Sequence, residues 1–177
     1  MEIERCRKLL VQILFWIYCL FLIYAILFKF LAFSFEDIIW MFQNFYPTFY
    51  RLNLIPFHYD REIGTYFHIT EILENILIFV PFGMLLKILN INNKKIVLLW
   101  FFSSFVLELC QFLFRIGSAD ITDLITNTLW TFLGIMVYEL FLKIFKTKGK
   151  TDKILTILTI IWIVVLLIFI LMLKIYN

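Results

Sequence analysis

The chain has 177 residues, of which 63% are hydrophobic, well above the roughly 45–50% that is usual for soluble domains. This composition excludes an ordinary soluble protein, and a formal net charge of +3 gives no reason to expect nucleic acid as a partner. The cysteines, Cys6, Cys19 and Cys110, are too widely spread to predict a disulfide framework or a zinc site. No cofactor is expected.

Several continuous apolar runs approach the ~20 residues that a helix needs to cross a bilayer. They do not alternate as the strands of a membrane barrel do, so they predict helices. We expect an all-α membrane protein, a bundle of about five transmembrane helices. The expected spans are residues 9–28, 71–89, 96–114, 124–145 and 154–173. The basic N-terminal segment is followed by an apolar run that is too long for the hydrophobic region of a signal peptide. This length predicts that the first span is retained in the protein.

The connection between the first two spans, residues 29–70, is rich in aromatic residues with scattered charges, which is typical of the headgroup boundary. Ser34 and Asp37 resemble a capping box. Apolar residues at helical spacing follow, which predicts either an amphipathic helix on the membrane or a loop helix packed on the bundle. Pro56 disfavours helix at Ile55, so residues 51–57 are expected to be extended or turned.

The second span contains Pro81, which cannot donate to the carbonyl of Leu77, and Gly83, which allows another backbone to approach. A kink is expected there. Asn75 lies too deep in this span to be explained as a feature of the helix start.

Two polar stripes mark the third and fourth spans. Ser104, Glu108, Gln111 and Arg115 share one face of a helix by their spacing. After a short turn at residues 117–118, the second stripe consists of Asp123, Asn127, Thr131 and Gly134. Helices joined so closely are antiparallel neighbours, so the two stripes are expected to face each other. Ionised groups inside a membrane normally face a partner, a cavity or a ligand.

The fifth span has no internal ionisable group, which predicts a membrane anchor or a packing scaffold. As a scaffold, it is expected to pack against a helix of a partner. We divide the chain into residues 1–145, four spans with the interfacial segment, and residues 146–177, a basic loop with the fifth helix. Of the 16 Lys and Arg residues, 11 fall on the side that holds the N-terminus. The positive-inside rule therefore predicts a multi-pass protein of the cell membrane with a cytoplasmic N-terminus and an extracellular C-terminus.

With this orientation the polar residues lie toward the outer surface. The candidate binding residues are Asn75, Glu108, Gln111, Arg115, Asp120, Asp123 and Asn127. Four interpretations fit them: a buried network that fixes helix register, a site for a hard cation, a general acid/base pair, or a pocket for a polar headgroup with an arginine as anion partner.

Four motifs in this order resemble the VanZ-like family. They are N-L-I-P-F at residues 53–57, N-I-L-I-F-V-P-F-G at 75–83, E-L-C-Q at 108–111 and D-L-I-T-N-T-L at 123–129. The resemblance reaches Tyr138 and leaves the fifth span outside. It departs at Trp130, where the pattern has a glycine.

The resemblance implies a bacterial membrane protein linked to reduced sensitivity to teicoplanin-type glycopeptides. We expect it to bind or shield a membrane lipid or lipid-linked cell-wall precursor at the outer leaflet, and a non-enzymatic role is favoured. Two alternatives stay open. One is an enzyme that modifies a lipid or peptidoglycan precursor headgroup, and the other is a small-solute transporter or accessory subunit.

Overall fold

The computed structural model describes residues 2–27, 52–57, 64–114 and 119–176. Within these ranges the helices are α1 (Glu2–Leu27), α3 (Gly64–Ile88), α4 (Asn93–Phe114), α5 (Ile121–Phe145) and α6 (Lys148–Tyr176). Two short strands, β1 (Leu52–Asn53) and β2 (Ala119–Asp120), pair in parallel. The predicted helical class is confirmed. The predicted amphipathic helix, which starts near Ser34, lies outside the described residues.

Three of the described helices are long and apolar enough to cross a membrane: Asn93–Leu113 of α4, Ile121–Phe145 of α5 and Lys148–Ile168 of α6. The other two contain shorter apolar stretches, Lys8–Tyr24 and Asn75–Ile88. These helices indicate a membrane protein, and the number of five spans stays a prediction.

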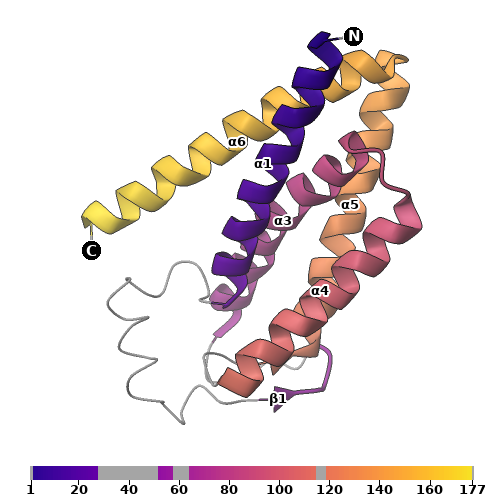
Figure 1. Ribbon diagram of the computed structural model, residues 1–177. Helices are drawn as coiled ribbons and strands as arrows, with labels where there is room; N and C mark the ends of the chain where they lie inside the picture. The colour runs from indigo at the N-terminus through magenta and orange to yellow at the C-terminus, as the bar shows by residue number, and fades with distance from the viewer. Residues whose placement is uncertain (1, 28–51, 58–63, 115–118, 177) are drawn as a thin grey trace.

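Helix α3 lies between α1 and α5 (Figure 1). The ring of Phe15 on α1 stacks on Phe82 at 5.8 Å, and the hydroxyl of Tyr18 donates to the carbonyl of Ile78 at 2.6 Å. The order of these contacts makes α1 and α3 antiparallel. Trp100 of α4 closes the core from another side, with ring centroids 5.0 Å from Phe79 and 4.5 Å from Phe82.

Helices α3 and α5 run parallel and cross at two glycines. A Cβ atom added at Gly83 would lie 2.2 Å from the carbonyl oxygen of Thr131, and one added at Gly134 would lie 2.2 Å from that of Val80. Backbone therefore meets backbone at this crossing, and no larger residue fits without moving a helix. Because glycine has no side chain, it allows the close approach of another backbone that the sequence predicted at Gly83.

Pro81 lies inside α3 and leaves the Leu77 carbonyl without its usual helical donor. The indole Nε1 of Trp162, on α6, donates to this carbonyl at 3.0 Å. The next carbonyl along the helix, that of Ile78, accepts the Tyr18 hydroxyl. Side chains from two other helices thus bond to α3 at the place where its own ladder is interrupted.

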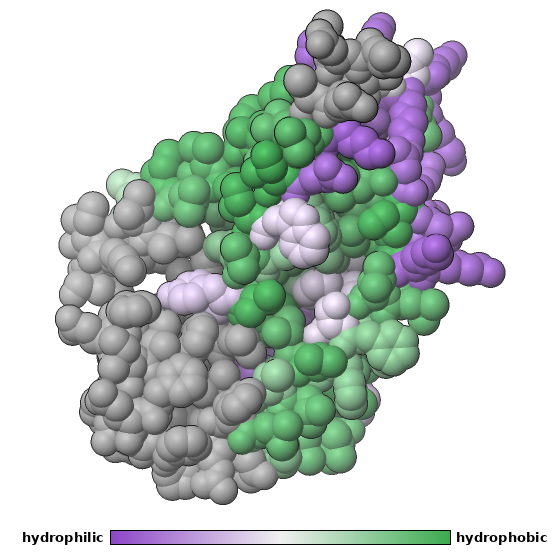
Figure 2. Space-filling view, viewed as in Figure 1, coloured by the Kyte–Doolittle hydropathy of each residue, from purple (hydrophilic) through white to green (hydrophobic). Residues whose placement is uncertain are grey.

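Charge is concentrated at one end of the molecule. Around the start of α4 and the passage from α5 to α6, seven lysines are exposed: Lys94, Lys95, Lys143, Lys146, Lys148, Lys150 and Lys153. Figure 2 shows hydrophilic residues gathered at the end where α5 passes into α6, while hydrophobic residues cover much of the rest of the visible described surface. This distribution agrees with the positive-inside pattern of the sequence.

Candidate functional site

The polar stripe of α4 is buried. Ser104, Glu108 and Gln111 are 0%, 7% and 2% exposed, respectively. They occupy the helix face that turns away from the exposed apolar residues of α4, among them Phe105, Leu109 and Leu113. The helical spacing read from the sequence therefore describes an inward-facing stripe.

The two predicted stripes meet at one point. The Nδ2 atom of Asn127 on α5 donates to the hydroxyl of Ser104 on α4 at 3.3 Å, and both side chains are buried. Beyond this point the stripe of α5 turns toward α3, because Thr131 and Gly134 form the close crossing with Gly83. The second stripe is therefore shared between two neighbours, where the sequence predicted a single facing helix.

A second contact joins the far end of α4 to the start of α5. Glu108 accepts the backbone N–H of Asp120 at 2.9 Å through its Oε2 atom. The Oδ1 atom of Asp120 in turn caps α5, because it accepts the N–H of Thr122 at 2.7 Å. Two carboxylates predicted as site residues thus lie together, each engaged with backbone N–H groups.

Asn53 also belongs to this cluster, although the sequence analysis did not include it among the site residues. Its Nδ2 atom donates to Oδ2 of Asp120 at 3.0 Å, and the pairing of β1 with β2 places the two residues opposite each other. The hydroxyl of Thr122 accepts the N–H of Phe57 at 3.0 Å. The N-L-I-P-F motif was the signal available in the sequence, but nothing in it indicated a partner 67 positions away.

The remaining predicted site residues are spread out. Gln111 donates to the carbonyl of Ile26 at 2.7 Å, so it joins α4 to α1 and does not face α5. Asp123 is half-buried in the first turn of α5, where a negative charge suits the helix dipole. Asn75 is half-buried on α3. Arg115 lies outside the described residues.

One buried polar atom in the cluster has no hydrogen-bond partner among the residues that the structure describes. The Oδ1 atom of Asn127 accepts no hydrogen bond in the described part of the chain, although its residue is only 3% exposed. A buried polar atom without a partner costs about 1–3 kcal/mol. Asn127 thus offers one unused acceptor to a donor that comes from elsewhere, such as a ligand or an ordered water.

Trp130, where the resemblance led us to expect a glycine, is half-buried and packs against the core. Its indole Nε1 is buried and has no acceptor among the described residues. The ring fills space one turn from Asn127, so it changes the packing beside the polar cluster.

No three His, Cys, Asp or Glu side chains come together at a metal-binding distance in residues 2–27, 52–57, 64–114 and 119–176. The hydrogen-bonding groups that do converge are carboxylates, carboxamides and hydroxyls. Such a set suits recognition of a polar group by hydrogen bonds.

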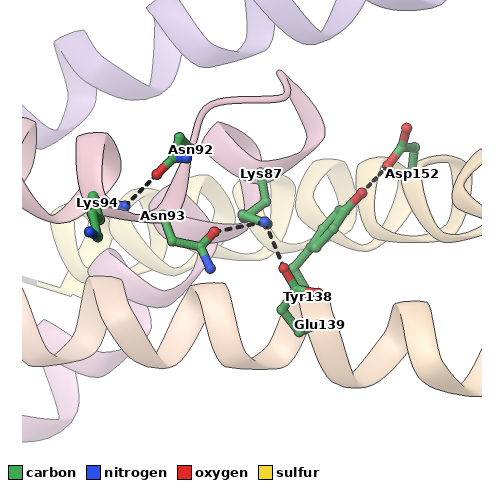
Figure 3. Close-up of polar contacts among 7 residues, drawn as sticks. All are labelled: Lys87, Asn92, Asn93, Lys94, Tyr138, Glu139 and Asp152. Carbon is green, nitrogen blue, oxygen red and sulfur yellow. Dashed lines mark hydrogen bonds and ion pairs between the residues drawn. The ribbon is translucent and has the colours of Figure 1, made fainter.

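A second polar cluster, which the sequence analysis missed, lies at the lysine-rich end (Figure 3). Lys87 of α3 pairs with Glu139 of α5 at 2.6 Å and donates to Asn93 at 2.7 Å. The hydroxyl of Tyr138 donates to Asp152 of α6, 2.9 Å away, and Asp152 is 4% exposed. Asp152 stands in a basic segment of the sequence and was therefore taken as part of a loop.

Comparison with known proteins places the chain in a family. The sequence matches the VanZ/LLP1 family over residues 15–142. It is 40% identical over 123 residues to Protein VanZ of Enterococcus faecium, an alignment that covers 67% of this chain and 70% of that protein. No solved structure matches the fold. The family match extends from α1 through most of α5 and includes both polar stripes, and on this evidence the chain belongs to the VanZ/LLP1 family.

Proposed function

We propose that this protein lowers the sensitivity of the bacterial envelope to teicoplanin-type glycopeptides. It does so by binding or shielding a lipid-linked cell-wall component at the outer leaflet. Membership of the VanZ/LLP1 family supports the link to antibiotic resistance. The buried polar cluster at the end of the bundle remote from the lysines supports binding as the mechanism.

The observation that carries the proposal is the unused acceptor of Asn127. Its Nδ2 atom is held by Ser104, so the carboxamide is fixed with Oδ1 turned away from that hydroxyl. A fixed acceptor without a donor suits a ligand that brings a hydroxyl or amide N–H, groups that sugars and peptides of cell-wall precursors carry.

The two carboxylates favour binding over catalysis. Glu108 and Asp120 both hold the start of α5, one through the Asp120 N–H and the other through the Thr122 N–H. Such bonds fix the position of a helix end. General acid/base catalysis instead requires a group that exchanges its proton with the substrate. We therefore assign these carboxylates to holding the site in shape.

The test replaces Asn127 with leucine, which has a similar size and no hydrogen-bonding group. We expect Asn127→Leu to reach normal membrane levels and to lose resistance, measured as a several-fold fall in the inhibitory concentration of teicoplanin. Thr128→Val is the matched control, because within the described part of the chain the Thr128 hydroxyl bonds only to its own helix, at the Leu124 carbonyl 2.8 Å away. It should retain resistance. Full resistance of Asn127→Leu at normal membrane levels would contradict the proposal.

A second measurement separates binding from chemistry. Envelope lipids from cells with and without the protein are compared by mass spectrometry, together with the lipids that co-purify with it. Binding predicts an unchanged set of covalent structures and an enriched lipid-linked precursor in the purified sample. A new covalent species that depends on the protein would support the enzyme alternative instead.

A further inference from the structure

The segment 52–57, here named the clamped loop, presents apolar side chains to the outside of the molecule. Leu52, Leu54, Ile55 and Phe57 are 54%, 64%, 61% and 49% exposed, and Pro56 is exposed as well. The segment carries no charged side chain. Apolar residues collected in this way on a short loop usually mark a contact surface.

The loop is held in place from both of its ends. Asn53 is bound to Asp120, and its own Oδ1 atom accepts the N–H of Ile55 at 3.2 Å. The N–H of Phe57 is bound by Thr122 at 3.0 Å, and Phe57 adopts a positive φ of 56° to make the turn. The exposed side chains are thus displayed on a fixed backbone that is attached to the start of α5.

These same hydrogen bonds lower the cost of moving the loop backbone out of water. The N–H groups of Ile55 and Phe57 are bound by side chains, and Pro56 has none to satisfy. Residues Leu52 and Asn53 pair with β2. Each N–H group that is paired within the protein lowers the cost of bringing the loop to the hydrocarbon boundary.

The position of the loop agrees with such a boundary. It pairs with β2, which lies between the end of α4 at Phe114 and the start of α5 at Ile121, two helices long enough to span a membrane. Figure 1 shows β1 at this end of the bundle. The exposed apolar side chains of α4, among them Leu109 and Leu113, reach the same end. The apolar side chains of the loop therefore lie at the same end of the bundle as this apolar surface of α4.

We infer that the clamped loop inserts its apolar side chains into the bilayer at this end of the bundle and holds the Asn53–Asp120–Glu108 cluster at headgroup level. The occupant of the exposed surface is lipid. The location beside the end of α4, a helix long enough to span a membrane, and the absence of charge in the loop favour acyl chains over a protein partner, whose interface would combine an apolar centre with a polar rim. This inference is independent of the antibiotic phenotype and of which side of the membrane the loop faces.

Site-directed spin labelling tests the inference on the full chain. Cys6, Cys19 and Cys110 are replaced by alanine, and a nitroxide is attached to Ile55→Cys or to Leu54→Cys. Both side chains are exposed, so the label replaces no core contact. The protein is placed in vesicles of phosphatidylethanolamine and phosphatidylglycerol. Collisions with oxygen, which enters lipid, are compared with collisions with a water-soluble nickel chelate. Lys150→Cys, on the exposed lysine-rich end, is the matched control.

A membrane-inserted loop gives an oxygen-to-nickel collision ratio several-fold higher at positions 54 and 55 than at position 150. A ratio equal to that at position 150 would place the loop in water and overturn the inference. Low collision rates with both reagents would place it under other parts of the chain, which would overturn it as well. Thermal unfolding of each labelled protein confirms that the fold is retained before the comparison is made.

Discussion

At the scale of single residues, Asp120 makes hydrogen bonds to three segments of the chain, the most distant of them 67 positions away. Its N–H donates to Glu108 of α4, its Oδ1 atom caps α5 at Thr122, and its Oδ2 atom accepts from Asn53 of β1. An N-cap alone contributes about 0.5–2 kcal/mol, and each further hydrogen bond contributes about 1 kcal/mol. The position of the start of α5 therefore depends strongly on Asp120 and its partners.

Exchanging the amide and the carboxylate across this contact tests it. Asp120→Asn keeps an acceptor for Thr122 but turns a donor toward the Asn53 amide, and we expect a loss of about 1 kcal/mol. Asn53→Asp alone sets two carboxylates opposite each other and is also destabilising. The double variant restores one donor and one acceptor with their order reversed. Thermal unfolding in detergent should place it closer to the natural protein than either single variant, and additive losses would refute the contact.

At the scale of helices, the glycine crossing fixes how α3 lies on α5. The crossing sets the register that brings Lys87 to Glu139 at one end of the pair. It also places Asn75, eight residues before Gly83, near the level of Thr126, eight residues before Gly134, because both helices rise by about 1.5 Å per residue. The close approach thus aligns polar residues on two helices.

Alanine substitution measures the crossing. Gly83→Ala and Gly134→Ala each put a Cβ atom against a backbone carbonyl, and overpacking of this kind costs about 1–3 kcal/mol. Gly149→Ala is the control, since a Cβ atom there meets nothing within 4 Å and alanine favours helix by up to ~1 kcal/mol. Unfolding midpoints should fall for the first two variants and stay level or rise for the third. Equal midpoints for all three would show that the helices do not meet at these glycines.

The sequence predicted the elements better than the contacts between them. Long apolar runs and helical spacing are local properties, which is why the helices and the meeting of Ser104 with Asn127 could be predicted. The Asn53–Asp120 contact joins residues 67 positions apart through a two-residue strand pair, too short to give a periodic signal. Pro81 predicted a carbonyl without a donor at Leu77, but no local pattern could identify Trp162 as the side chain that binds it.

At the scale of the whole molecule, the seven exposed lysines and the Glu108–Asp120 cluster lie at opposite ends of the same helices. The lysines surround the start of α4 and the passage from α5 to α6, whereas the carboxylates lie where α4 ends and α5 begins. This charge asymmetry predicts that the lysine-rich end lies in the cytoplasm, because loops rich in lysine tend to stay there.

Reporter fusions test this orientation. A reporter that is active only in the cytoplasm should work when fused after Lys148 and fail when fused after Gly117, because one span separates the two positions. Fusion after Lys94 is the matched control and should behave like the fusion after Lys148. Activity after Gly117 together with silence after Lys148 would reverse the orientation and place the carboxylate cluster on the cytoplasmic side.

The bond between Trp162 and Leu77 has a consequence for the order in which the protein is made. Trp162 is synthesised 85 residues after Leu77, a delay on the order of ten seconds at about 5–20 residues per second. During that time α3 has already been produced, while the indole donor for its Leu77 carbonyl does not yet exist. Tyr18, in contrast, precedes α3 and is ready to bind the Ile78 carbonyl. Hydrogen bonding around the proline of α3 is therefore completed only when α6, a helix made much later, has been synthesised.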